Sequence, residues 1–192
     1  MAEHLEEKTS ARAPSSILRR VSAAVAIGAA ALVLTWAVVW RNGSSGSTGP
    51  VVANSIKPTA LSLGGLHTLA AAVPQPIFWA GPKKGYLYEL TRQTNGNVYI
   101  RYLPPGVNAG APGTKYLVVA TYPVSNAFQA LKAVSKGKDF RIPRSGIALV
   151  RPQDTKSVLL AFPHLNYQVE VFDPSPAVAR RLVVSGTIKP AR

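Results

Sequence analysis

The sequence contains no cysteine, and this absence excludes several kinds of chemistry at once. Disulfide bonds, thiolate metal ligands and cysteine nucleophiles are all ruled out. If the folded part of the chain lies outside the cytoplasm, its core must be stable without covalent cross-links.

Acidic residues are also scarce. The 192 residues include 8 Asp and Glu against 22 Lys and Arg, so the formal net charge is +14. An excess of this size favours attraction to anionic surfaces or polymers and carries no information about the fold.

Catalytic and cofactor motifs are missing as well. The three histidines share no metal-ligand spacing, and no nucleophile elbow, P-loop or dinucleotide-binding glycine motif occurs. We therefore expect no metal, no cofactor and no catalytic residue. The one enzyme hypothesis that remains is an envelope hydrolase that uses Glu89 or Glu170. The alternative for these two glutamates is that each forms a cross-strand ion pair with a basic neighbour.

One long apolar run dominates the N-terminal part of the chain. Residues 21–40, VSAAVAIGAAALVLTWAVVW, contain no charged residue, and Trp36 and Trp40 lie at one end. Twenty helical residues extend about 30 Å, which is the hydrocarbon thickness of a bilayer. The run predicts a transmembrane helix. A cleaved signal peptide is the alternative, but its apolar region is usually shorter and is followed by small residues rather than Trp-Arg.

Basic residues are more frequent before this helix than after it. Four precede it and two follow closely, which places the N-terminus in the cytoplasm and the C-terminal domain outside the cell membrane. Ala24 and Gly28 form a small-xxx-small pair, a candidate face for homodimerisation; alternatively, small residues are simply tolerated there.

Composition divides the chain into four parts. Residues 1–20 form a polar cytoplasmic tail, 21–40 the membrane helix, 41–59 a linker that contains NGSSGSTGP, and 60–192 an extracytoplasmic domain. In this domain, apolar spacing predicts helices near 60–73, 124–136 and 174–185, separated by short strands. The fold class is therefore α+β, with an antiparallel sheet and helices.

Local motifs give further detail. Asn95-Gly96 predicts a two-residue hairpin turn, since both residue types tolerate positive φ. Asp173-Pro174 predicts a helix cap followed by proline in the first turn, with Val178 and Leu182 on the buried face.

The second half of the domain repeats the order of the first. An offset of 51 aligns Tyr116 with Tyr167 and Pro123 with Pro174. The order predicts two β-β-β-α units, and chance similarity of two helix-capped strands is the alternative. Some strands are apolar on both faces, which favours helices on both sides of the sheet or packing against a partner; we expect the helix at 60–73 to cover the second face.

Two basic loops are candidate ligand sites. The first, within FWAGPKKGYLYEL, contains Lys83, Lys84 and Gly85, whose backbone amides and lysines predict an anion site unless the loop is only a turn between strands. The second runs from residue 136 to 144 and contributes Lys136, Lys138, Arg141 and Arg144. Aromatic and basic residues alternate in Tyr99-Ile100-Arg101-Tyr102, but no RNA-binding signature accompanies them, so nucleic acid is not the expected partner.

Several motifs of the chain resemble those of a group of bacterial proteins. With WAGPKKGYLYEL, VYIRYLPPG, TYP, LAFP and YQVEVFDPSP, the stretch 75–185 resembles a group of uncharacterised bacterial single-pass membrane-anchored proteins. The resemblance implies a bacterial cell-envelope setting and implies no catalytic role.

These observations support three functional hypotheses. The first is a membrane-anchored, non-catalytic domain that binds an anionic envelope component, lipid headgroups or an acidic protein. The second is an accessory subunit of a membrane complex, and the third is the hydrolase named above.

Overall fold

The computed structural model describes residues 56–192, and these residues belong to one compact unit. The predicted tail, the membrane helix at 21–40, the Ala24/Gly28 face and most of the linker lie outside the described residues. Within residues 56–192, no helix has the length and apolarity needed to cross a bilayer.

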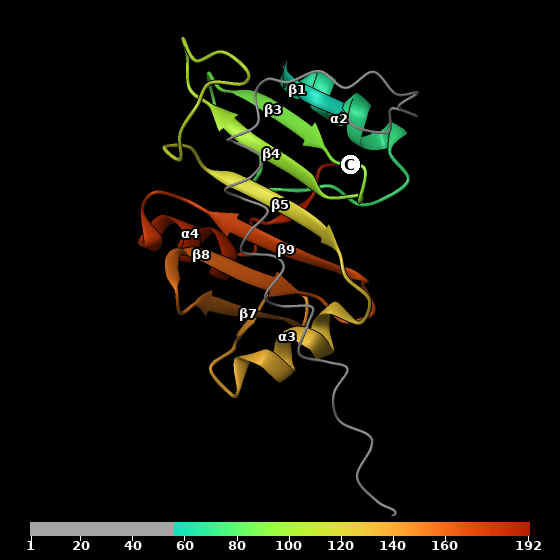
Figure 1. Ribbon diagram of the computed structural model, residues 1–192, viewed down its shortest axis with the longest axis vertical. Coiled ribbons are helices and arrows are strands. Elements are labelled where there is room, and N and C mark those ends of the chain that lie inside the picture. Colours follow the sequence, from blue (N-terminus) through green and yellow to red (C-terminus); the bar gives the residue numbers. More distant parts are fainter. Residues whose placement is uncertain (1–55) are drawn as a thin grey trace, which may run out of the picture. The chain divides into compact units, whose positions relative to one another are not determined.

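Eight antiparallel strands form one sheet, which confirms the α+β class (Figure 1). Their spatial order is β1-β3-β4-β5-β9-β8-β7-β6. The strands are β1 (Ile56–Leu61), β3 (Leu87–Arg92), β4 (Val98–Leu103), β5 (Val118–Pro123), β6 (Phe140–Ile142), β7 (Gly146–Arg151), β8 (Asp154–Ala161) and β9 (Tyr167–Phe172). A second, two-stranded sheet pairs β2 (Phe78–Trp79) with β10 (Lys189–Pro190). Three helices complete this part of the chain: α2 (Leu63–Ala72), α3 (Ala127–Ser135) and α4 (Pro176–Val184).

Strand β1 begins at Ile56, inside the stretch 41–59 that was expected to be a linker. It contains Pro58, which has no backbone N–H to donate to a neighbour. The strand lies at the edge of the sheet and its register shifts between Ile56 and Thr59, which is where proline is tolerated in a sheet. The proline explains why the sequence pattern did not predict this strand.

The two faces of the sheet are covered by different elements. On one face, α2, α4 and the β2/β10 pair bury the larger core, which includes Leu66, Tyr88 and Ile100. On the other face, α3 buries a smaller cluster with Leu131 and Leu149. The doubly apolar strands are thus covered within the chain. The helix at 60–73 was expected to cover the second face, but α2 lies on the same face as α4, and α3 covers the other.

The predicted repetition is visible in the order of elements. Strands β3-β4-β5 precede α3 and strands β7-β8-β9 precede α4, and the two helices have nine residues each. Strands β5 and β9 pair at the middle of the sheet. The helices nevertheless lie on opposite faces, so the two halves are not packed alike.

Two local predictions were wrong in detail. The β3–β4 connection is longer than a two-residue turn: only Gly96 has positive φ, +85°, and the Asn95 side chain accepts a hydrogen bond from Asn97 N at 3.0 Å. Helix α4 has Ser175 at its N-cap position, without a capping hydrogen bond from the side chain, and Pro176 in its first turn. The Asp173 side chain instead accepts from Ser175 N at 2.9 Å.

The buried face of α4 is accordingly displaced by one residue. Ala179 and Val183 are buried, while Val178 and Leu182 are only partly covered. Gly186 ends the helix region with φ +72°, as predicted.

Candidate functional site

The first predicted loop is a turn, but it does not join two paired strands. Tyr86 N donates to Lys83 O at 3.1 Å and Gly85 has φ +78°, which is the geometry of a β-turn over residues 83–86. Lys83 N donates to the Tyr88 hydroxyl oxygen at 2.8 Å. The N–H groups of Lys83 and Tyr86 are therefore used internally and are not available to an anion.

The cations of this loop differ in their surroundings. Lys83 Nζ lies 4.0 Å above the centre of the Tyr86 ring, while Lys84 is exposed. The base of the loop is held by Tyr102, whose hydroxyl accepts from Ala80 N at 2.7 Å and donates to Gly81 O at 3.0 Å. The loop is thus anchored to the sheet and presents its lysines at the surface.

The C-terminal segment connects this loop to the second one. β10 pairs with β2, which brings the C-terminal segment beside the first loop. The chain is close there: a Cβ atom built on Gly81 would lie 3.7 Å from Thr187 Cγ2. The same segment is close to the second loop, because a Cβ atom built on Gly186 would lie 3.0 Å from Pro143 Cγ. Residues 186–189 therefore lie between the two predicted basic loops. Lys83 of the first loop and Arg141 of the second are 58 residues apart in sequence.

Arg144 strengthens this connection. Its guanidinium donates to Ile188 O and lies 4.9 Å above the Phe162 ring. Arg144 is therefore a structural link as well as a surface charge. Its neighbour Arg141, on the edge strand β6, is exposed.

Lys136 and Lys138 do not share the surroundings of Arg144. Both follow α3, the helix on the other face of the sheet, and both are exposed. Lys136 is the C-cap of α3 in the left-handed conformation, with φ 49°, and Gly137 follows it with φ +80°. The nine-residue loop predicted as one basic site is thus divided. Arg141 pairs with Ile147, whose side chain belongs to the α3 cluster, so Arg141 shares the face of Lys136 and Lys138. Arg144 instead contacts Ile188 and Phe162.

The carboxylates lie in a different setting. Glu89 and Arg101 are direct cross-strand partners, with Oε2 and NH2 2.5 Å apart and side-chain exposures of 6% and 4%. Glu89 also accepts from Gly110 N at 2.7 Å, and Arg101 donates to Ala111 O at 2.5 Å. This buried ion pair ties the glycine- and proline-rich loop 104–117 to the sheet.

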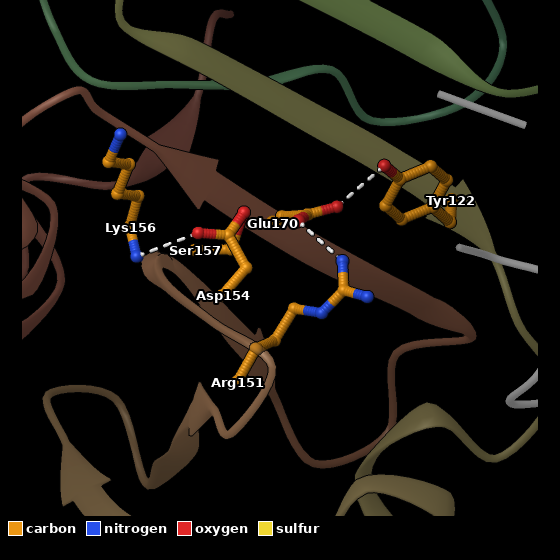
Figure 2. A network of polar contacts seen from close by, with 6 residues as sticks. All are labelled: Tyr122, Arg151, Asp154, Lys156, Ser157 and Glu170. Carbon is orange, nitrogen blue, oxygen red and sulfur yellow. Dashed lines mark hydrogen bonds and ion pairs between the residues drawn. The ribbon is translucent and has the colours of Figure 1, made fainter. Parts of the chain in front are cut away.

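Glu170 forms the second ion pair. Figure 2 shows Tyr122 and Arg151 approaching the Glu170 carboxylate from two sides. The Tyr122 hydroxyl donates to Oε2 at 2.8 Å, and Arg151 NH1 donates to Oε1 at 3.1 Å. Nearby, Asp154 accepts from Lys156 N at 3.1 Å and Ser157 Oγ at 3.4 Å (Figure 2).

Burial raises the pKa of Tyr122 well above its usual value, and the adjacent Glu170 carboxylate raises it further. Burial likewise raises the pKa values of Tyr99 and Tyr102. A raised pKa keeps these phenols protonated at neutral pH, so Tyr102 and Tyr122 can donate hydrogen bonds to Gly81 O and to Glu170.

The prediction of an ion pair for each strand glutamate is confirmed. Strands β3 and β9 are separated by β4 and β5, so Glu89 and Glu170 are three strand spacings apart, or about 14 Å. Carboxylates that act together in glycoside hydrolysis lie within about 9.5 Å of each other. This geometry does not favour a hydrolase built on the two residues. Within residues 58–192, no group of histidine, aspartate and glutamate side chains could hold a metal ion.

Sequence reasoning missed the segment that joins the loops. Thr187 and Ile188 follow the helix-ending Gly186, and two consecutive β-branched residues after such a glycine are a weak indication of a strand. Ile188 is 1% exposed, and Ala191 N donates to Ile77 O at 2.8 Å. No family model, no curated protein and no solved structure matches the chain, so its site rests on this geometry alone.

Proposed function

We propose that this protein is a membrane-anchored module whose extracytoplasmic α+β domain binds an anionic component of the cell envelope or an acidic partner. The apolar run at 21–40 would anchor the chain, and the excess of basic residues before it supports an N-terminus in the cytoplasm. No catalytic step is part of the proposal.

One observation carries the proposal: the acids of the domain are used internally, while most of its cations are not. From residue 76 onward there are 16 Lys and Arg and 5 Asp and Glu. Each of the five carboxylates accepts a hydrogen bond from within the chain. They are Glu89, Asp139, Asp154, Glu170 and Asp173.

Only two cations of this part of the chain, Arg101 and Arg151, take part in ion pairs. The predicted site residues Lys84, Lys136, Lys138 and Arg141 are all exposed. A surface with so many uncompensated positive charges attracts anions and repels other cationic surfaces. This distribution favours binding of an anionic partner over a role in solubility alone, for which mixed charges would suffice.

The accessory-subunit hypothesis has less support. It rests on the alanine-rich helix at 21–40, which lies outside the described residues, and on strands that are apolar on both faces. Within residues 56–192, α3 and α4 cover both faces of the second half of the sheet, so these strands offer the hypothesis no uncovered face there.

The test uses the full-length chain held in nanodiscs of neutral lipid, so that its apolar run at 21–40 is already inserted and does not itself enter the vesicles. Its binding to an anionic polymer and to anionic vesicles is measured against neutral counterparts, at about 0.1 M and about 1 M salt. We expect binding only to the anionic probes and a steep loss at high salt. Binding that is absent, or equally strong at both salt concentrations, would contradict the proposal.

The orientation has its own test. A reporter that is active only outside the cytoplasm, fused after Arg192, should be active. A cytoplasmic C-terminus would contradict the proposed setting without bearing on the charge-driven binding.

A further inference from the structure

Helix α2 differs from the other two described helices in carrying no charge. Residues 58–82, which include α2, contain no Lys, Arg, Asp or Glu, and this is the longest such stretch in residues 56–192. By contrast, α3 exposes Lys132, and α4 exposes Arg180 and Arg181. The surface over α2 therefore departs from the rest of a chain whose net charge is +14.

The outer face of α2 is exposed and consists mainly of small or apolar residues. Leu66 and Ala70 are buried one turn apart, so the opposite side of the helix faces away from the core. The exposed residues of the helix are Leu63, Gly64, His67, Thr68, Ala71 and Ala72. Leu63 is 41% exposed, and a Cβ atom built on Gly64 would meet no other atom within 4 Å. This exposure leaves the face open to a partner.

The ends of α2 also lack the charges that favour a helix in water. Its first turn has no acidic residue and its last turn has no basic residue, although such residues stabilise a solvated helix by complementing its dipole. Ser62 caps the helix and accepts a hydrogen bond from Gly65 N at 3.2 Å. Because no charged group has to be desolvated, the outer face of α2 leaves water at little cost.

Two cations lie beside this face on the C-terminal segment. The His67 imidazole contacts Ala191 O, and its ring lies 5.2 Å from that of Trp79, edge to face. Trp79 in turn pairs with Lys189 in the β2/β10 sheet. Helix α2 and β10 lie side by side over the same face of the large sheet, with the C-terminus next to α2 (Figure 1). The exposed Lys189 and Arg192 therefore flank the outer face of α2.

The chain enters the described domain at this place. The apolar run ends at Trp40 and β1 begins at Ile56, so residues 41–55 separate them. A chain of this length spans at most about 55 Å. Helix α2 follows β1 and packs against it. If residues 21–40 anchor the chain, α2 is held near the bilayer at a high effective concentration, and a weak contact suffices.

We propose that the outer face of α2, flanked by Lys189 and Arg192, is the surface by which the domain rests on an anionic lipid bilayer. The inference rests on the proposed function, because it requires the anchor at 21–40, and it adds which surface meets the lipid. Leu63 and the alanines enter the interface, and the two cations stay at the level of the headgroup phosphates.

A second copy of the chain is the other occupant that an uncharged helix face could take. A twofold contact through α2 would place Lys189 and Arg192 of both copies at the rim of one small interface, where like charges repel. An anionic leaflet attracts the same side chains. The ten-residue helix is about 15 Å long, which is short for the roughly 800 Å² per partner that a stable interface buries. Charge and size therefore favour the bilayer.

The experiment uses the absence of cysteine, because a single introduced cysteine gives a unique position for a fluorescent label. Full-length variants are compared in nanodiscs that contain phosphatidylglycerol, and quenching by nitroxide groups on the lipid headgroups is measured. Thr68→Cys and, as a second position, Ala71→Cys place the label on the outer face of α2. The control Val134→Cys places it on α3, which lies over the opposite face of the sheet.

We expect a label at residue 68 or 71 to lose most of its emission and a label at residue 134 to lose little. In the Thr68→Cys background, Lys189→Gln/Arg192→Gln should weaken the contact equilibrium by about tenfold or more. The matched control Lys132→Gln/Lys156→Gln removes two exposed cations elsewhere and should change it by less than about twofold.

The failures are distinguishable. Equal quenching on α2 and α3, or equal losses in the two charge variants, would overturn α2 as the resting surface. Quenching at no position would overturn the contact with the bilayer and leave charge-driven binding of a soluble anion intact; coupling between labels at residue 68 of two copies would then favour a second copy. If the chain is not retained in nanodiscs, the anchor itself, and with it the proposed function, is overturned.

Discussion

Charge is handled in opposite ways on the sheet face that carries Glu89 and Glu170 and in the basic loops at 81–85 and 141–144. On the sheet face, each glutamate is buried and bonded to an arginine. The loops contain Lys83, Lys84, Arg141 and Arg144, all exposed, and no carboxylate, and Lys83 and Arg144 rest on aromatic rings. A buried charge without a partner is very costly, whereas an exposed one is well solvated. The face therefore bears on stability, and we propose that the loops bear on recognition.

The largest effect on stability is expected at Glu89. Glu89→Gln leaves Arg101 buried at 4% exposure without its carboxylate and weakens the tie to Gly110. Breaking a pair of this kind costs about 3 to 5 kcal/mol. Chemical denaturation of the variant and the wild type measures the difference.

A double variant sharpens this first prediction. Glu89→Leu/Arg101→Met removes both charges and should recover much of the lost stability, because no unpaired charge remains. If the single variant were as stable as the wild type, the distinction between the sheet face and the basic loops would be lost.

A smaller effect is expected at Glu170, where the partner is less buried. Arg151 has 18% side-chain exposure, so water can partly replace the lost carboxylate after Glu170→Gln. We expect a cost of about 1 to 3 kcal/mol, from the same denaturation measurement. Asp154→Asn, at a half-buried turn, is the control and should cost less.

Alkaline pH should reveal the buried phenols. The pKa of Tyr122 is raised in the folded state, so above its ordinary value of 10.0 the unfolded chain releases a proton that the folded chain keeps. The free energy of unfolding should therefore be unaffected by this group below about pH 10 and fall as the pH rises beyond it. Tyr122→Phe should show a shallower fall between pH 9 and about pH 11. Identical slopes for variant and wild type would contradict the prediction.

The smallest effect on stability is expected for exposed cations of the basic loops and of β10. The triple variant Lys84→Gln/Arg141→Gln/Lys189→Gln removes exposed charges that have no ion-pair partner among residues 58–192. Its stability should stay within about 0.5 kcal/mol of the wild type. A large loss would mean that these cations serve the fold, and the comparison between the sheet face and the exposed cations would fail.

The sequence by itself determined most of the elements and part of the site. Local patterns sufficed for strands β4 and β7, for the apolar spacing of α3 and for the ion pair of each strand glutamate. The same patterns identified Lys83, Lys84, Gly85, Arg141 and Arg144 as surface residues of two loops. Periodicity and turn chemistry act over a few residues, so they are visible in the sequence.

Only the tertiary structure decided which of these residues meet. β1 and β10 escaped prediction because Pro58 and the two-residue length of β10 give no alternating pattern, and their pairing partners lie far along the chain. The junction of residues 81–85 with 141–144 depends on the C-terminal segment between them, and the separation of Lys136 and Lys138 from Arg144 depends on α3 packing on the opposite face. Such contacts are selected by burial across the whole core, which no local pattern records.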